Sequence, residues 1–203
     1  MHQIIRPEKN RLLKRLQDEP RRFIQVLYGP RQVGKTTLVK QLAKETRLEH
    51  LVVAADGVPV NDAQWISTQW NIARLRQKAL NAPFLLIIDE VQKIENWSEY
   101  VKAEWDADAF NNIDIRLLLL GSSRLMLQQG LSESLMGRFE ATYLGHWSLS
   151  EMQEAFGITA DEYVWFGGYP GAMFLRDDDE RWRAYVRDAM LETSISKEIL
   201  MLT

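Results

Sequence analysis

Residues 29–36 constrain this chain more than any other stretch. Their sequence, GPRQVGKT, fits the pattern G-x-x-x-x-G-K-[ST] at every specified position. In that pattern a glycine-rich loop joins a strand to a helix, and its backbone N–H groups form a concave nest for phosphate oxygens. Residues 23–28 are typical of a strand running into the loop, and residues 37–43 of a helix leaving it. The sequence therefore predicts a nucleotide site between a strand and a helix.

Each residue type in this loop has a physical reason. Gly29 and Gly34 can take backbone angles that other residues avoid, so the loop can close around a phosphate. Lys35 supplies a mobile positive charge for the β- and γ-phosphates, and the Thr36 hydroxyl is a suitable Mg²⁺ ligand. Thr37 could bond the α-phosphate. We expect the whole loop to bind nucleotide: Gly29, Pro30, Arg31, Gln32, Val33, Gly34, Lys35, Thr36 and Thr37.

Length and composition limit the class of protein. The 203 residues, 46% of them hydrophobic, suffice for one α/β domain with a small appendage. The chain has no cysteine, and its three histidines lie far apart, so zinc is not supported. No apolar run approaches the length of a membrane span, and no signal-peptide core follows Met1. The net charge of −3 gives no general attraction to nucleic acid. We expect a soluble, cytoplasmic protein.

A second informative stretch is the apolar run of residues 84–88, which ends at Asp89 and Glu90. An unbroken run of this kind indicates a strand buried on both faces of a parallel sheet. Its carboxyl end faces the crevice where such folds bind ligands. We expect Asp89 to hold Mg²⁺, directly or through water, and Glu90 to orient and deprotonate the attacking water. Helix capping is the alternative interpretation, and the phosphate loop upstream favours the catalytic one.

Three further strands are expected. Residues 50–54 are typical of a short buried strand, residues 115–121 of another buried strand, and residues 141–144 of a last one. Ser122 and Ser123 follow the second of these. If that strand lies between the phosphate-loop strand and the Asp-Glu strand, either serine could hydrogen-bond the γ-phosphate or the attacking water. A helix N-cap explains the serines equally well.

Helical spacing of apolar residues predicts helices over residues 8–18, 63–80, 96–110 and 148–156. The cations of residues 6–22 are dispersed with acids and are typical of a solvated helix face. Residues 131–136 continue helically into a turn at Gly137. Arg138, in this turn, could reach transition-state charge in its own site or in a neighbour's, and a surface ion pair explains it equally well. In residues 63–80 the expected core contacts are Trp65, Ile66, Ile72, Leu75 and Leu80.

After residue 147 the strand pattern stops and helices follow. We therefore expect a core domain over residues 1–147 and a small helical lid over residues 148–203. A compact turn at residues 167–171 is expected to begin a helix at Ala172, and the acidic run 177–180 suits the start of the last helix. The last helical pattern ends without a cap or stop signal, so we expect a piece of a longer protein.

Five segments together resemble the prokaryotic AAA-type ATPases of the AAA_14 group: residues 29–37, 86–92, 119–123, 135–139 and 167–170. The first two are shared with many P-loop ATPases, and the Gly-Arg-Phe and Gly-Gly-Tyr-Pro pieces are the specific ones. The resemblance implies a three-layer P-loop sandwich with a five-stranded parallel sheet of AAA+ type, followed by a small helical lid. It also implies a C-terminal domain of the DUF4143 type, often likened to restriction-type nucleases, before which this sequence ends.

The resemblance also implies residue roles. Lys35, Thr36, Asp89 and Glu90 take Walker-type roles, Ser122 or Ser123 a sensor role, and Arg138 the role of an arginine finger. Gly168 and Pro170 resemble a Gly-x-Pro element that senses the nucleotide near its base. AAA+ sensors are more often Asn or Thr, so the serines depart from the pattern. Adenine is implied by the resemblance, and no Asn-Lys-x-Asp guanine-reading element is present.

These features predict a Mg²⁺-dependent ATPase that hydrolyses ATP to ADP and phosphate and couples the cycle to a conformational change. A homo-oligomer is expected as its assembly. One alternative is a slowly hydrolysing, nucleotide-gated switch or partner-binding module. A second is a DNA-stimulated motor that binds through the cations of residues 6–22.

Overall fold

The structure is a computed structural model that describes the backbone of residues 4–121 and 134–191, with side chains up to residue 188. The chain divides into two compact units. One consists of Ile5–Pro30 and Gly34–Leu144, and we call it the sheet unit. The other consists of Met1–Ile4, Arg31–Val33 and Gly145–Thr203, and we call it the helical unit. The domain boundary predicted after residue 147 stays a prediction.

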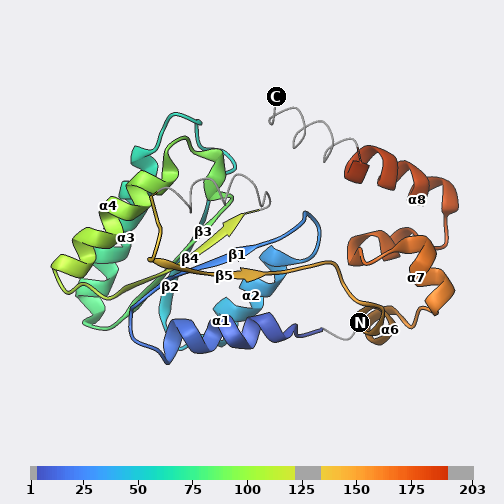
Figure 1. Ribbon diagram of the computed structural model, residues 1–203, viewed down its shortest axis with the longest axis horizontal. Coiled ribbons are helices and arrows are strands. Elements are labelled where there is room, and N and C mark those ends of the chain that lie inside the picture. The colour runs from blue at the N-terminus through green and yellow to red at the C-terminus, as the bar shows by residue number, and fades with distance from the viewer. Residues whose placement is uncertain (1–3, 122–133, 192–203) are drawn as a thin grey trace. The chain divides into compact units, whose positions relative to one another are not determined.

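The sheet unit is built on a five-stranded sheet whose paired strands all run parallel, in the order β2-β3-β4-β1-β5 (Figure 1). This confirms the predicted α/β fold with a parallel sheet. The condition set for the serines is also met, because β4 lies between β1 and β3. The strands are β1 (Ile24–Tyr28), β2 (Glu49–Ala54), β3 (Phe84–Asp89), β4 (Ile115–Gly121) and β5 (Phe139–Tyr143).

The central strands are buried on both faces, as their unbroken apolar sequences predict. In β3 the first five residues are all buried, and alternate ones pack with α3 and α4 in one core cluster. The prediction of a buried strand at residues 50–54 is wrong in one respect. β2 is an edge strand, none of its residues is fully buried, and Val52 keeps half of its surface exposed.

The helices of the sheet unit follow the predicted ranges within a residue or two. Figure 1 shows α3 and α4 together beside the sheet, and α1 and α2 together along another side of it. A short 3₁₀ helix, η1, joins β3 to α4. The helices are α1 (Pro7–Gln17), α2 (Lys35–Glu45), α3 (Gln64–Leu80), η1 (Val91–Lys93) and α4 (Trp97–Phe110).

The buried face of α3 differs from the expected one. Ile66, Trp70 and Ala73 are fully buried, at the i, i+4, i+7 spacing of one helix face. Leu75 lies two positions past Ala73, on another side of the helix, and is 71% exposed. Ile72 and Leu80 are also exposed. Ile72, Leu75 and Leu80 lie off this face, but their apolar side chains made them resemble core contacts in the sequence.

The helical unit contains α6 (Leu149–Phe156), α7 (Ala160–Phe166), η2 (Pro170–Leu175), α8 (Asp179–Tyr185) and a π-helical turn, η3 (Val186–Leu191). Two reciprocal capping boxes start α6 and α7: Ser148 with Glu151, and Thr159 with Glu162. Met152, Ile158 and Met173 form a small buried cluster.

Two expectations for the helices need correction. Ala172 does not begin an α-helix, because it lies inside the 3₁₀ turn η2 that starts at Pro170. The next α-helix starts after Asp178, whose side chain accepts a hydrogen bond from the Arg181 amide. The helix expected over residues 131–136 falls partly outside the described residues, and Ser134 to Met136 lie in a turn and bend. In the part of the chain that the structure describes, no helix is long and apolar enough to cross a membrane.

Candidate functional site

The two motif glycines meet strict backbone demands. A Cβ atom on Gly29 would lie 2.0 Å from the carbonyl oxygen of Leu144, so no side chain fits there. Gly34 has a φ of 96°, in the left-handed region that favours glycine, and is the residue from which α2 begins. The turn between β1 and α2 therefore has the tight geometry that a phosphate nest requires.

The ammonium group of Lys35 is folded back onto its own loop. Nζ donates to the carbonyl oxygens of Gly29, at 2.9 Å, and Pro30, at 2.6 Å. The residue is only 8% exposed. A positive charge is thus held inside the loop, at the amino end of α2, where the helix dipole also favours an anion.

The next residue links the loop to the end of β3. The Thr36 hydroxyl donates to Asp89 Oδ2 at 3.2 Å, and the Glu90 amide donates to Asp89 Oδ1 at 2.9 Å. Burial raises the pKa of Asp89, the adjacent charge of Glu90 raises it further, and the Thr36 hydrogen bond opposes both. The structure thus brings Lys35 and Thr36 together with Asp89 and Glu90. Thr36 and Asp89 are 53 positions apart in the sequence.

The donor set here fits Mg²⁺. A hydroxyl and a carboxylate oxygen within hydrogen-bond distance are hard-oxygen ligands that one small cation could share. Mg²⁺ is usually held by one or two carboxylates together with substrate phosphates rather than by a full protein cage. Among the described residues, no cluster of three or more His, Cys, Asp or Glu side chains could hold a metal ion.

One residue at this edge was missed by sequence reasoning. Gln92, in η1, is buried, and its side-chain Nε2 donates to Glu90 Oε2 at 2.7 Å. The resemblance covers Gln92 through residues 86–92 but gives it no role, and a glutamine in a short helical turn is ordinarily a surface residue.

The middle of the loop makes contacts within the helical unit. Trp147 Nε1 donates to the carbonyl of Val33 at 3.0 Å, and the Tyr185 hydroxyl donates to Gln32 Oε1 at 2.6 Å. Gln32 has a φ of 62°, an uncommon conformation for a residue with a side chain. Trp147 and Tyr185 are therefore further candidate functional residues. Their hydrogen bonds to the loop are seen in the structure and could not be predicted from the sequence.

The Gly-Gly-Tyr-Pro segment is tied to the same tryptophan. The Trp147 amide donates to Gly168 O at 3.1 Å, and a Cβ on Gly168 would lie 2.3 Å from the Trp147 carbonyl oxygen. His146 and Tyr169 make an edge-to-face ring contact, with centroids 4.6 Å apart. Pro170 begins η2, and its predicted contact with nucleotide stays a prediction.

Arg138 lies at the opposite end of the strands from the phosphate loop. Its carbonyl accepts from the Ile24 amide at 2.8 Å, at the amino end of β1, whereas the phosphate loop follows the carboxyl end of β1. Five strand residues separate the two ends, about 17 Å. The guanidinium makes a bidentate pair with Asp106 of α4, at 2.8 and 2.9 Å. This pair lowers the pKa of Asp106.

Ser122 and Ser123 lie outside the described residues. β4 ends at Gly121, which pairs in register with Tyr28, the last residue of β1 before the loop. The chain therefore leaves β4 beside the phosphate loop, where the sensor role was expected, and that role stays a prediction.

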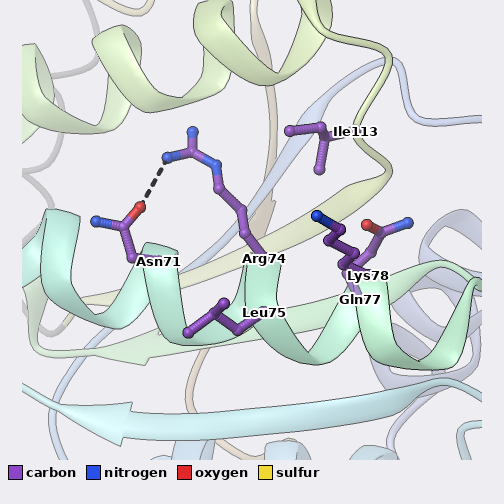
Figure 2. Close-up of a pocket in the computed structure, with 6 residues that line it drawn as sticks. All are labelled: Asn71, Arg74, Leu75, Gln77, Lys78 and Ile113. Atoms are coloured by element: carbon purple, nitrogen blue, oxygen red, sulfur yellow. Dashed lines mark hydrogen bonds between the residues drawn. The ribbon is translucent and has the colours of Figure 1, made fainter.

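A recess away from these residues has no comparable chemistry. Figure 2 shows it along α3, lined by Asn71, Arg74, Leu75, Gln77, Lys78 and Ile113, with a volume of about 410 Å³. Its arginine is committed to structural partners: Arg74 donates to Asp108 Oδ1 at 2.6 Å and pairs with Glu104 at 2.6 Å. None of the phosphate-loop or carboxylate residues described above lines this recess.

Comparison with known families identifies the class of protein. The AAA_14 family, described as an AAA domain, matches residues 21–153. This range contains the phosphate loop, Asp89, Glu90 and Arg138. The chain belongs to the AAA_14 family, and it is a nucleotide-binding domain of the AAA ATPase class. A comparison with curated proteins found no match.

Two solved structures show the same fold. The Holliday junction branch migration motor RuvB of Thermotoga maritima is 21% identical, with a TM-score of 0.50 over 74% of this chain and 49% of RuvB. A structure from work on katanin self-assembly is 17% identical, with a TM-score of 0.56 over 81% of this chain and 63% of that protein. The chain thus spans about half of one neighbour and under two thirds of the other, and both likenesses show the fold.

Proposed function

We propose that this domain binds ATP with Mg²⁺, hydrolyses it to ADP and phosphate, and transmits the change through the helical unit. The observation that carries the proposal is the hydrogen bond from Thr36 to Asp89, because it joins the phosphate loop to the acidic end of β3. Glu90 follows directly, so the base lies beside the proposed metal ligands. These are the parts that phosphoryl transfer requires.

The residues act in sequence along this edge. The loop amides and Lys35 hold the β- and γ-phosphates, and Thr36 and Asp89 would hold Mg²⁺, which neutralises charge on the phosphate oxygens when bound. Glu90 takes a proton from water as the water oxygen bonds to the γ-phosphorus. The bond from phosphorus to the bridging oxygen breaks, and its electron pair leaves with ADP.

Coupling to the helical unit is supported by the contacts at the crest of the loop. Trp147 and Tyr185 bond Val33 and Gln32, which are part of the loop expected to close on phosphate. A phosphate that repositions these two loop residues would strain or break the bonds to Trp147 and Tyr185. The helical unit is therefore the element that we expect to respond to nucleotide.

Arg138 is proposed to act on the site of a neighbouring chain. Its position at the amino edge of β1 and β5 argues against a role at its own phosphate loop. The self-assembly named for katanin makes an oligomer a reasonable proposal for this chain too. In this proposal Arg138 exchanges Asp106 for charge that develops on a neighbour's nucleotide.

The cations of residues 6–22 do not favour a DNA-driven motor. A phosphate-binding surface needs several cations that can reach the backbone of the nucleic acid. Here three of these side chains have partners within the sheet unit. Lys9 pairs with Glu45 at 2.5 Å, Arg15 with Glu140 at 3.4 Å, and Arg21 stacks over Trp105 at 3.5 Å.

The proposal is tested by multiple-turnover phosphate release from purified protein with ATP and Mg²⁺. Wild type should turn over, and Glu90→Gln should bind ATP with unchanged affinity while its rate falls by about 10²-fold or more, as loss of a general base predicts. Glu95→Gln, at an exposed glutamate beyond η1, is the matched control and should keep the wild-type rate. Tight ADP retention without turnover would instead indicate a nucleotide-gated switch, and a wild-type rate in Glu90→Gln would remove Glu90 from the base role.

A further inference from the structure

The side chain of Gln92 is placed to control the orientation of Glu90. Only 7% of Gln92 is exposed, and its Nε2 lies 2.7 Å from Glu90 Oε2. Such a short bond to an ionised acceptor is stronger than one between neutral groups. The bond links the side chains of Gln92 and Glu90, which lie two residues apart on the same turn.

The element that carries Gln92 is fixed to the core. Val91 and Ile94, on either side of it, are 0% and 1% exposed. The Lys93 amide donates to the Glu90 carbonyl at 3.0 Å, and the Ile94 amide donates to the Val91 carbonyl at 3.2 Å. Glu90 itself has a φ of 54°, in the left-handed region that residues with side chains seldom adopt. The amide of Gln92 is therefore presented to the carboxylate by a rigid turn.

A primary amide suits this task chemically. It donates a hydrogen bond but does not take up a proton near neutral pH, so it cannot compete with Glu90 as the base. A carboxylate has about four lone-pair sites, and one donated hydrogen bond leaves it able to accept a proton from water. The amide thus restricts where the carboxylate points without removing its function.

We propose that Gln92 is a positioning residue for ATP hydrolysis, whose side-chain amide holds the Glu90 carboxylate in the orientation from which it deprotonates the attacking water. This inference rests on the proposed function, because it requires Glu90 to be the base. A carboxylate that rotates freely spends less time aligned with water, and small misplacements of reacting groups reduce rates by one to two orders of magnitude. Nucleotide affinity, which depends on the loop and Lys35, should not change.

The test compares two buried glutamines that make the same kind of bond. Gln25, in β1, is 3% exposed, and its Nε2 donates to Glu140 Oε2 at 3.0 Å, away from the acidic end of β3. Gln92→Met and Gln25→Met each remove the amide donor and nearly preserve the length of the side chain. We expect Gln92→Met to lower kcat about tenfold, with KM and the Kd for a fluorescent ATP analogue changed less than about twofold. We expect Gln25→Met to keep the wild-type kcat.

Rates are expressed per nucleotide-binding site, counted with the same analogue, so loss of folded protein does not imitate loss of catalysis. If Gln92→Met does not fold, Gln92→Glu decides, because it keeps the shape and replaces the donor with a like charge; the same fall in kcat is expected. A wild-type kcat in the folded variant, or equal falls in both methionine variants, would overturn the inference. An inactive wild type, or an active Glu90→Gln, would instead overturn the proposed function.

Discussion

At the scale of single residues, nucleotide binding at the proposed site requires Lys35 to change its hydrogen-bond partners. Its ammonium group donates to two carbonyl oxygens of its own loop, which are neutral acceptors. A phosphate oxygen carries a negative charge and makes the stronger hydrogen bond. We therefore expect Lys35 to exchange both carbonyl partners for a phosphate when a nucleotide binds.

We predict that Lys35→Ala weakens ATP binding by roughly a hundredfold or more, because removing one side of a desolvated charge pair typically costs 2–5 kcal/mol. Lys40→Ala, at an exposed lysine of the same helix α2, should bind with wild-type affinity. Isothermal titration calorimetry with ATP and Mg²⁺ measures both. Equal affinities in the two variants would remove Lys35 from the phosphate site.

At the scale of elements, the ion pair between Arg138 and Asp106 ties the start of β5 to α4. The hydrogen bond from Arg138 is the main cause of the lowered pKa of Asp106. A carboxyl group whose pKa is lower in the folded state stabilises the fold above its unfolded pKa, and this contribution disappears as the pH falls through the folded value. The pair is part-exposed, so the effect is modest.

We therefore predict that wild type loses more stability than Asp106→Asn when the pH falls from about 5 to about 3, a range that includes the ordinary Asp pKa and extends below it. Urea unfolding of both proteins at several pH values measures the difference. Asp161→Asn, at an exposed aspartate in the first turn of α7, is the control and should follow wild type. Parallel pH profiles for wild type and Asp106→Asn would show that the pair contributes nothing to stability.

Prediction from sequence succeeded where the structure is local. The strand and the helix on either side of residues 29–36 belong to one contiguous motif, and the apolar run before Asp89 defines β3 without reference to other strands. It failed where the answer depends on packing. Leu75 suits a core as well as Trp70 does, and only the crossing of α3 over the sheet decides which is buried. The hydrogen bonds from Gln92 to Glu90 and from Trp147 to Val33 follow from no spacing rule.

At the scale of the whole molecule, the place of Arg138 makes one domain insufficient for the complete proposed site. The strand register separates Arg138 from its own loop by the length of β1. In the proposed arrangement, a second copy brings its Arg138 to this loop. Activity should then depend on protein concentration.

We predict that mixing Arg138→Ala chains with Lys35→Ala chains restores part of the lost ATPase activity, because a mixed pair contains one site with an intact loop and an intact arginine. Each variant alone should be at least about tenfold slower than wild type. This is a conservative figure, because an arginine finger contributes about 10³-fold or more to kcat. Phosphate release from mixtures at equal total concentration measures the recovery. A mixture no faster than its components, under conditions where light scattering shows an oligomer, would contradict action between chains.

The strand order has a further consequence for how the domain is made. β1, which leads into the phosphate loop, does not pair with β2, the next strand to be synthesised; it pairs with β4 and β5, through Leu118 and Phe139 among others. During translation the loop therefore leaves the ribosome long before its supporting strand has any partner. Contacts so distant in sequence carry a loop-closure cost and slow folding. The phosphate loop is therefore synthesised early, but the sheet that supports it is completed late. We expect a nascent chain to bind ATP only after β4 and β5 have emerged from the ribosome.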